Sequence, residues 1–136
     1  MKKSLLFLFV FASLLITSCG EQGPSTKIDV VMTDFQFTPN QFIVPAAQEI
    51  TLNVVNNGGV VHNFVIMNLG VTAGPMFEGD DEANVYWQER DIPSGGDFSV
   101  TFIAPSEPGV YEVVCRTEGH IASGMVGKLI VVVEEE

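Results

Sequence analysis

The side chains best suited to bind a metal ion follow a regular spacing near the end of the chain. Cys115, His120 and Met125 form the pattern Cys-x4-His-x4-Met, and the other histidine, His62, lies far upstream. The chain has only two Cys and two His, so both histidines and the one cysteine outside the N-terminal segment belong to a single proposed cluster. This scarcity excludes a framework of several disulfides and a zinc ribbon.

The four side chains form a ligand set that suits copper. A thiolate, two imidazoles and a thioether are soft to borderline donors, and two His and one Cys in a trigonal plane with a weak axial Met are the ligands of a blue-copper electron-transfer site. Ligands drawn from one loop and one distant strand are held by the scaffold, so the site need not change shape between Cu(I) and Cu(II). The pattern predicts one type 1 copper ion and one-electron chemistry.

Each ligand taken singly has a simpler interpretation. Met125 is typical of a core residue, a lone histidine is often a hydrogen-bonded loop or core residue, and Cys115 is typical of a small buried apolar side chain. Taken together these interpretations weaken, because Cys115 ends a strand-like run in which Tyr111 and Val113 share its face.

The first residues predict an export signal rather than a structural element. Lys2 and Lys3 precede an uncharged, almost wholly apolar run from Leu5 to Ile16. A membrane-spanning helix needs about 20 apolar residues, so this shorter run is typical of a secretory signal peptide. The run ends in Thr17-Ser18-Cys19.

This ending resembles the bacterial lipobox, in which small residues precede a cysteine that becomes lipidated. The resemblance implies a signal peptide over residues 1–18, a lipid on Cys19 and a polar tether over 19–26. More than one acyl chain makes membrane attachment stable, so the protein is expected to be a lipoprotein held outside the cytoplasm, in the periplasm or at the cell surface. The alternative is an ordinary signal peptide that ends near a cysteine.

The rest of the chain, residues 27–136, predicts one all-β domain. Strand-like runs alternate with Pro and Gly turn signals, which is typical of a β-sandwich or barrel. In the run 49–55, Ile50, Leu52 and Val54 share one face. The expected strands are 27–33, 41–44, 49–55, 60–67, 97–104, 109–115 and 127–133, and the aromatics expected in the core are Phe35, Phe37, Phe42, Phe64, Phe98, Phe102 and Tyr111.

One segment, 68–93, lacks this alternation of strand-like runs and turns and is expected to be a long excursion between two strands. Ala83 to Glu89 is compatible with a helical turn. The acidic cluster from Glu78 to Glu82 suggests calcium, but the order of acids and glycine found in an EF-hand is absent.

The charge balance excludes several classes of function. The chain has 17 acidic and 6 basic residues and a net charge of -11, which disfavours nucleic-acid binding because phosphates require clustered Lys and Arg. A multicopper enzyme needs further histidines, and a dinuclear copper centre needs two cysteines in the domain. The sequence therefore predicts that the chain is not a self-contained copper enzyme, and it leaves open a subunit of one.

With these residues in view, the chain resembles the cupredoxins, the blue copper proteins. The stretches that carry the resemblance are Val61–Phe64, Ala104-Pro105, Pro108–Tyr111 and Cys115–Gly127, and with the strand pattern it covers about 27–134. The resemblance implies a Greek-key β-sandwich of seven or eight strands with copper at one end.

The resemblance also implies a role for each site residue. His62, Cys115 and His120 are the in-plane ligands and Met125 is the axial ligand. Asn63 matches an asparagine whose side chain ties the two ligand loops together, a supporting role around the metal. The alternative for Asn63 is an ordinary turn-forming or capping residue.

The spacing between the ligands indicates which cupredoxins the chain is most similar to. Plastocyanins have a shorter Cys–His spacing and azurins a shorter His–Met spacing, so Cys-x4-His-x4-Met is most similar to auracyanin, a membrane-attached bacterial cupredoxin. Glu118 stands where Pro is common, and its charge is expected to lower the potential of the copper. Val61 precedes His62 where azurin has a Gly whose carbonyl contacts copper, which leaves a fifth contact open.

The predicted function is a monomeric, lipid-tethered one-electron carrier. In the family an edge of the second histidine reaches the surface, so His120 is the expected electron exit, with Ile121 and Ala122 in an apolar contact patch. Redox proteins such as cytochromes or membrane electron-transport complexes are the expected partners.

Two other functions use the same fold. Copper storage or delivery outside the cytoplasm requires a similar site, but Met32, Met67 and Met76 are scattered rather than clustered. A copper-free adhesion domain conflicts with the complete ligand set.

Overall fold

The computed structural model of the chain describes residues 23–134. The predicted signal peptide, Cys19 and most of the predicted tether lie outside the described residues. Within them, nine strands and one short helix are present, namely β1 (Lys27–Thr33), β2 (Gln36–Thr38), β3 (Gln41–Pro45), β4 (Glu49–Asn56), β5 (Val65–Met67), α1 (Gly79–Glu82), β6 (Val85–Gln88), β7 (Asp97–Ile103), β8 (Gly109–Val114) and β9 (Val126–Val132).

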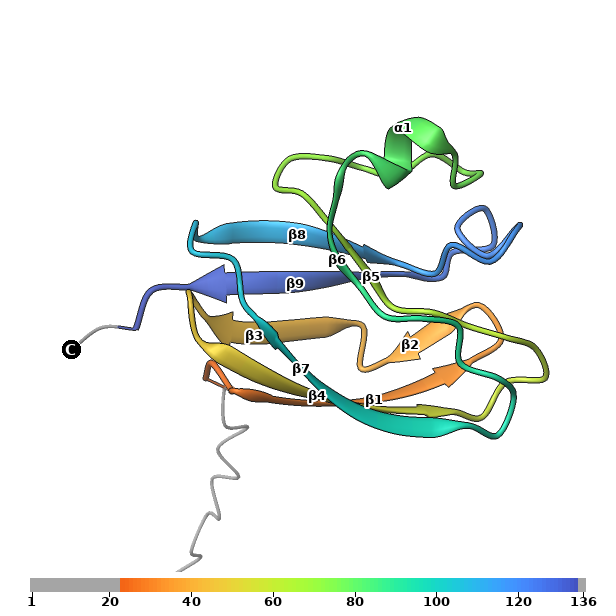
Figure 1. The fold of residues 1–136 in the computed structure, drawn as a ribbon, viewed down its shortest axis with the longest axis horizontal. Helices are drawn as coiled ribbons and strands as arrows, with labels where there is room; N and C mark the ends of the chain where they lie inside the picture. The colour runs from red at the N-terminus through yellow and green to blue at the C-terminus, as the bar shows by residue number, and fades with distance from the viewer. Residues whose placement is uncertain (1–22, 135–136) are drawn as a thin grey trace, which may run out of the picture.

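The strands form two sheets that pack face to face (Figure 1). One sheet has the order β2-β1-β4-β7 and the other β3-β9-β8-β5-β6. The β1/β4 and β3/β9 pairs are parallel and the other pairs antiparallel. The predicted all-β sandwich is confirmed, with nine strands in place of seven or eight.

Period-two alternation accounts for the core between the sheets. In β1 and β4 every second residue is buried, and Ile50, Leu52 and Val54 all face inward as predicted. Successive side chains of a strand point to opposite faces, so a one-residue shift would expose this entire apolar set. The parallel register pairs Leu52 with Ile28 and Val54 with Val30, which places the apolar residues of both strands on the same face.

The predicted aromatic core is correct except at one position. The buried members are Phe37, Phe42, Phe64, Phe102 and Tyr111, while Phe98 is partly buried. Phe35 is 46% exposed, so its assignment to the core is wrong. It lies in the turn between β1 and β2 with a left-handed φ of 66°, where the strand alternation no longer applies.

The excursion 68–93 is more ordered than its composition indicates. The helical turn predicted at Ala83–Glu89 is wrong, because β6 occupies most of that stretch and α1 precedes it. β6 adds to the edge of the second sheet beside β5. Its Trp87 stacks on Phe102 with 4.8 Å between ring centroids, so the edge strands β6 and β7 of the two sheets are in contact.

The strand predicted over 60–67 is shorter than expected. Only Val65–Met67 forms β5, and His62 makes an isolated bridge to Ile92. The backbone N–H of each donates to the carbonyl of the other, at 3.1 and 2.8 Å between nitrogen and oxygen. His62 is thus held in extended backbone at the mouth of the sandwich.

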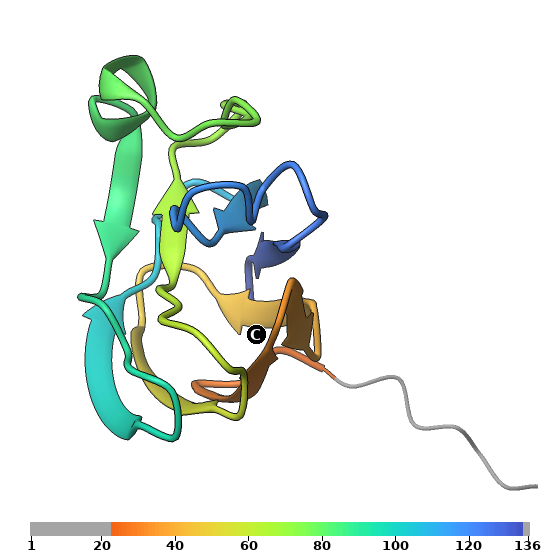
Figure 2. The ribbon, with the colours of Figure 1, turned by 90° about the vertical axis from the view of Figure 1, so that its right-hand side faces the viewer.

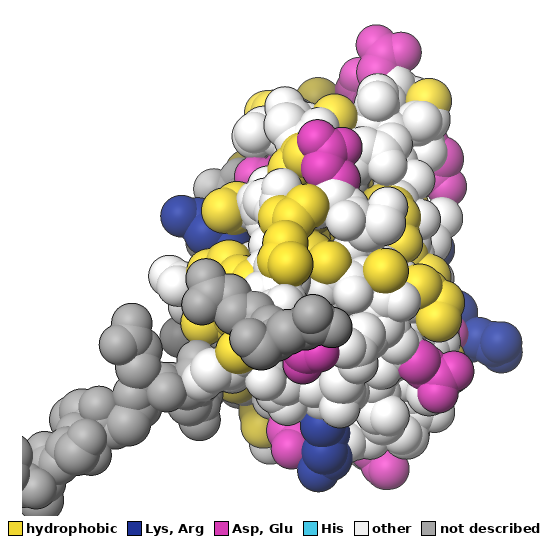
Figure 3. All heavy atoms as spheres, turned by 90° about the vertical axis from the view of Figure 1, so that its left-hand side faces the viewer, with side chains coloured by type: hydrophobic (Ala, Val, Ile, Leu, Met, Phe, Trp, Pro, Cys, Tyr) yellow, Lys and Arg dark blue, Asp and Glu magenta, His cyan; other side chains and the backbone are white. Residues whose placement is uncertain are grey.

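The two ends of the sandwich differ. The loops that follow β4 and β8 meet at one end, which faces the viewer in Figure 2. The opposite end, in Figure 3, shows hydrophobic side chains gathered on its surface, and the exposed Ile103, Val110 and Val133 stand at the strand termini there. β1 begins at this second end (Figure 1).

Among residues 23–134, no helix is long and apolar enough to cross a membrane.

Candidate metal centre

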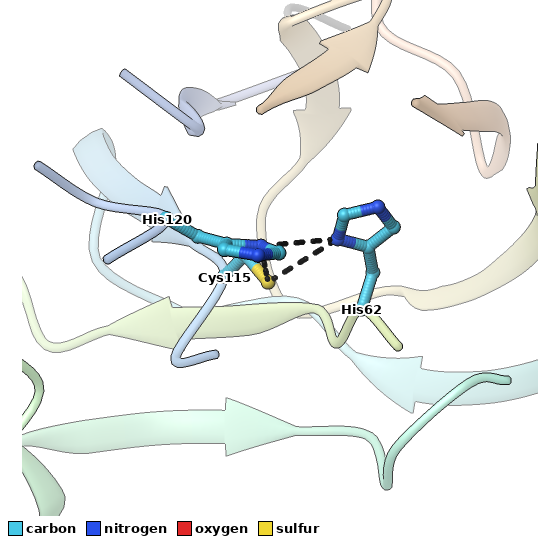
Figure 4. A group of neighbouring side chains, drawn as sticks. All are labelled: His62, Cys115 and His120. Carbon is cyan, nitrogen blue, oxygen red and sulfur yellow. Dashed lines mark hydrogen bonds between the residues drawn. The ribbon is translucent and has the colours of Figure 1, made fainter. Parts of the chain in front are cut away.

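Three predicted ligands converge at the first end of the sandwich (Figure 4). His62 comes from the loop between β4 and β5, Cys115 directly follows β8, and His120 lies in the loop between β8 and β9. The Nδ1 atoms of the two histidines are 3.2 Å apart, and the Cys115 Sγ is 3.4 Å from His120 Nδ1 and 3.8 Å from His62 Nδ1. All three side chains are buried.

Local backbone hydrogen bonds fold the loop that carries two of these ligands. The N–H of Met125 donates to the His120 carbonyl at 2.9 Å, and the N–H of Cys115 donates to the Met125 carbonyl at 3.4 Å. Gly119 and Gly124 take left-handed φ values of 78° and 94°, a region in which glycine has no steric penalty. The loop therefore curls back and places His120 beside Cys115.

The electrostatics of the site favour neutral histidines. Burial lowers the pKa of His62, with Asp34 acting in the opposite direction. Burial also lowers the pKa of His120, and the charge of His62 lowers it further. A neutral imidazole with its proton on Nε2 presents a lone pair at Nδ1, which is the form that binds a metal.

The geometry of these three atoms fits a metal ion. Ligands bonded at about 2.0–2.3 Å and spread in a plane are about 3.5–3.7 Å apart, and the three separations of 3.2, 3.4 and 3.8 Å bracket that distance. In the copper-free protein one of these nitrogens can donate a proton to the other, and a metal ion can take the place of that proton and accept both lone pairs. Two His and one Cys in this arrangement fit copper.

Met125 and Asn63, the other two predicted site residues, are both buried. Met125 is fully buried in the same core cluster as Cys115. The Asn63 side-chain carbonyl accepts the backbone N–H of Arg116 at 2.6 Å, and its NH2 donates to the Asp91 carboxylate at 3.0 Å. Asn63 therefore joins the segment of His62 to the residue after Cys115.

Three details bear on what the sequence suggests for the loops. The Val61 carbonyl accepts a hydrogen bond from the Thr117 hydroxyl at 3.1 Å, so it is engaged in a contact with the second ligand loop. Glu118 is exposed. His120 is only 5% exposed, and the exposed ring of Phe35 packs edge-on against it at 5.2 Å between ring centroids.

The sequence reasoning missed the turn between β1 and β2, which contacts both histidines. Asp34 brings a carboxylate oxygen to 3.4 Å from His62 Nε2, while Phe35 contacts His120. No spacing motif marks these residues, since they lie 28 and 85 positions from the histidines they touch. The one available signal was Asp34 itself, an acid in a tight turn between two apolar strands.

Comparison with known proteins identifies the family. The family model described as "Cupredoxin-like domain" matches residues 6–131, which is most of the chain. The chain belongs to the cupredoxin-like family. The predicted resemblance is thereby confirmed, and the cofactor of such a site is one copper ion.

Individual cupredoxins are moderately similar in sequence. Chloroplastic plastocyanin of Chlamydomonas reinhardtii is 29% identical over 88% of this chain and 74% of the relative. Auracyanin-B of Chloroflexus aurantiacus is 33% identical over 70% of this chain. The alignment covers 46% of that relative's length, so this chain spans about half of it.

Solved cupredoxin structures share the fold. The dithionite-reduced auracyanin of Roseiflexus castenholzii superimposes with a TM-score of 0.68 at 29% identity, covering 81% of this chain and 99% of the other. Auracyanin A of Chloroflexus aurantiacus, described as a "blue" copper protein, has a TM-score of 0.64 at 26% identity, covering 78% and 98%. The predicted similarity to auracyanin agrees with both matches.

Proposed function

We propose that this cupredoxin is a type 1 copper electron carrier that shuttles single electrons outside the cytoplasm. The observation that carries the proposal is the convergence of two imidazole Nδ1 atoms and one thiol on one buried point, with His62, Cys115 and His120 drawn from two separate loops. Met125, buried beside them, is the proposed axial ligand. When bound there, copper supplies the Cu(II)/Cu(I) couple.

The protein's own contribution is to hold the donor atoms in one place. His62 is fixed by its backbone bridge to Ile92 and by Asn63, which ties its loop to Arg116. Cys115 directly follows β8, which is paired on both sides within the second sheet. A scaffold that does not rearrange lowers the barrier to a one-electron step, because ligand motion is the main cost of such a transfer.

His120 is the proposed exit for the electron. It is the ligand nearest a contact surface formed by Phe35, Ile121 and Ala122, of which Phe35 and Ala122 are exposed. Cytochromes or membrane electron-transport complexes are the proposed partners, and the carrier is proposed to act as a monomer.

The proposed membrane tether is compatible with electron exit at His120. Cys19, the proposed lipid site, precedes β1, and β1 begins at the end of the sandwich away from the ligands (Figure 1). A lipid at that end leaves the copper end directed away from the bilayer and open to a partner. The tether concentrates the carrier at the membrane without covering its site.

The first experiment is a visible absorption spectrum of residues 20–136 with Cu(II) added. An intense thiolate-to-copper band that bleaches with a reductant and returns with an oxidant is the expected result. The absence of this band from a folded, copper-exposed sample would contradict the proposal. Reversible cycling without loss of metal also separates an electron carrier from a storage or delivery protein, which is expected to release copper to a chelator or acceptor.

The lipid is tested separately on the full chain in a bacterial host. Wild-type protein is expected in the membrane fraction with a mass increase on the peptide that begins at Cys19. A Cys19→Ala variant is expected to lose that mass increase and its membrane attachment, with the copper band unchanged. Membrane association of the variant equal to that of the wild type would overturn the tether.

A further inference from the structure

The second nitrogen of His62 faces a carboxylate that no part of the electron-transfer proposal uses. His62 Nε2 is fully buried and makes no hydrogen bond to any described residue. The nearest charged atom is Asp34 Oδ1, at 3.4 Å. This separation and its alignment fall short of a good hydrogen bond, so the contact is mainly electrostatic.

The surrounding backbone holds Asp34 in this place. The N–H of Gly59 donates to the same Asp34 oxygen at 2.9 Å. Gly58 passes so close that an added Cβ would lie 2.5 Å from His62 Nε2 and 2.6 Å from Asp34 Oδ1. A side chain at Gly58 would therefore separate the carboxylate from the imidazole, and only glycine leaves the approach open.

This arrangement places the carboxylate on the far side of the ring from the metal position. His62 Nδ1 points at Cys115 and His120, while Nε2 points at Asp34. A carboxylate on the non-ligating nitrogen of a metal-bound histidine fixes the ring tautomer and makes the imidazole a stronger donor. A stronger, more negative donor set stabilises Cu(II) more than Cu(I).

On the basis of the proposed function, we infer that Asp34 is a positioning residue that orients His62 and lowers the reduction potential of the copper. The residue acts through His62 and does not contact the metal. Its side chain is 49% exposed, so solvent screens part of the charge. The effect predicted for Glu118, which is exposed, stays a prediction, and the two carboxylates can be compared directly.

The test compares Asp34→Asn with Glu118→Gln in the full-length chain, purified in detergent and loaded with copper. Each variant removes one negative charge and preserves side-chain size, and potentials are read by spectroelectrochemical titration of the absorption band. Because solvent screens the half-exposed Asp34 carboxylate, Asp34→Asn is expected to weaken the preference for Cu(II) by about threefold to tenfold, less than the loss of a buried supporting carboxylate. This change converts to a rise of about 28–59 mV for a one-electron couple. Glu118→Gln is expected to change it less than about threefold.

A second measurement needs no copper. In the copper-free protein at pH 8, nitrogen NMR of the imidazoles is expected to show His62 with its proton on Nε2, and Asp34→Asn is expected to mix in the other tautomer. Gly58→Ala keeps the charge but separates the pair, and it is expected to move both the tautomer and the potential in the same direction as Asp34→Asn.

The outcomes are distinguishable. Equal potentials in Asp34→Asn and Glu118→Gln would overturn the inference, because the carboxylate would then act only as one surface charge among many. An unchanged His62 tautomer in Asp34→Asn would overturn it even if that variant binds no copper. A wild-type protein without the thiolate-to-copper band would instead overturn the proposed function.

Discussion

Two regions of the molecule, the Cys115–Met125 loop and the β1–β2 turn, contribute to the metal centre, and they differ in how the sequence encodes them. The Cys115–Met125 loop supplies donor atoms from within one short segment. The β1–β2 turn supplies only outer contacts, Asp34 on His62 and Phe35 on His120. Donor chemistry demands particular residue types, so the first region shows a motif, whereas many residue types can support a ligand from behind. The contrast predicts large effects from the loop and graded effects from the turn.

The largest effect is expected from Cys115→Ser. The serine hydroxyl does not provide the soft thiolate, so the visible charge-transfer band should vanish completely in the copper-exposed protein. Ser123→Ala is the matched control, since Ser123 is exposed in the same loop and its hydroxyl, the only group removed, donates to the Gly119 carbonyl. Its band should match that of the wild type, and a persisting band in Cys115→Ser would refute the ligand assignment.

A smaller effect, a loss of stability, is expected from Asn63→Ala, which removes the hydrogen bond between the His62 segment and the second ligand loop. Removing the buried amide leaves the Arg116 N–H without its acceptor, and we expect a loss of about 1–3 kcal/mol in the free energy of unfolding of the copper-free protein. Urea denaturation measures it.

The control for this loss is Asn53→Ala, which removes an exposed hydrogen bond to Asp29. It should cost less than about 1 kcal/mol. Equal losses in the two variants would show that Asn63 does not join the loops in any special way.

The pH dependence of the copper-free protein tests the two histidines together. Burial lowers the folded-state pKa of both His62 and His120, so below the ordinary value of about 6.5 the unfolded chain binds protons more readily than the folded protein. The stabilisation is complete above about pH 6.5 and is lost as the pH falls towards the lowered values. Urea midpoints between pH 8 and pH 5 should decline accordingly.

Two comparisons sharpen this pH test. Bound Cu(I) competes with protons for the same nitrogens, so it should move the decline to lower pH. A His62→Gln, His120→Gln double variant should lack the decline in this range. A decline that persists in the double variant would assign it to other groups.

The smallest effect is expected from Phe35→Gly in the turn. Glycine relieves the left-handed φ of 66°, a gain of about 1–2 kcal/mol, but it loses the ring contact with His120, worth about 0.5–1.5 kcal/mol. The free energy of unfolding should therefore change by less than about 1 kcal/mol.

Gln36→Gly, one residue into β2, is the control for this substitution. It has no backbone strain to relieve and should cost about 0.5–1 kcal/mol. If Phe35→Gly costs much more than Gln36→Gly, the Phe35 ring stabilises the protein by more than the backbone strain and the single ring contact account for.

The sequence by itself determined the donor set, the inward faces of the strands and the class of the fold. These features follow from residue type and local period: Cys115, His120 and Met125 lie in one short segment with the regular spacing Cys-x4-His-x4-Met, and Ile50, Leu52 and Val54 alternate within one strand. The prediction failed where local pattern and tertiary position diverge. Phe35 is apolar yet exposed, and the segment around Trp87 has a composition compatible with a helix yet pairs with β5.

Only the tertiary structure decided what surrounds the ligands. The contact of Asp34 with His62 depends on the place of the β1–β2 turn beside His62 and on the absence of a side chain at Gly58. The packing of Phe35 against His120 depends on the left-handed backbone conformation of Phe35 itself. Such contacts join segments far apart in the chain through the packing of two sheets, and no spacing along one dimension encodes them.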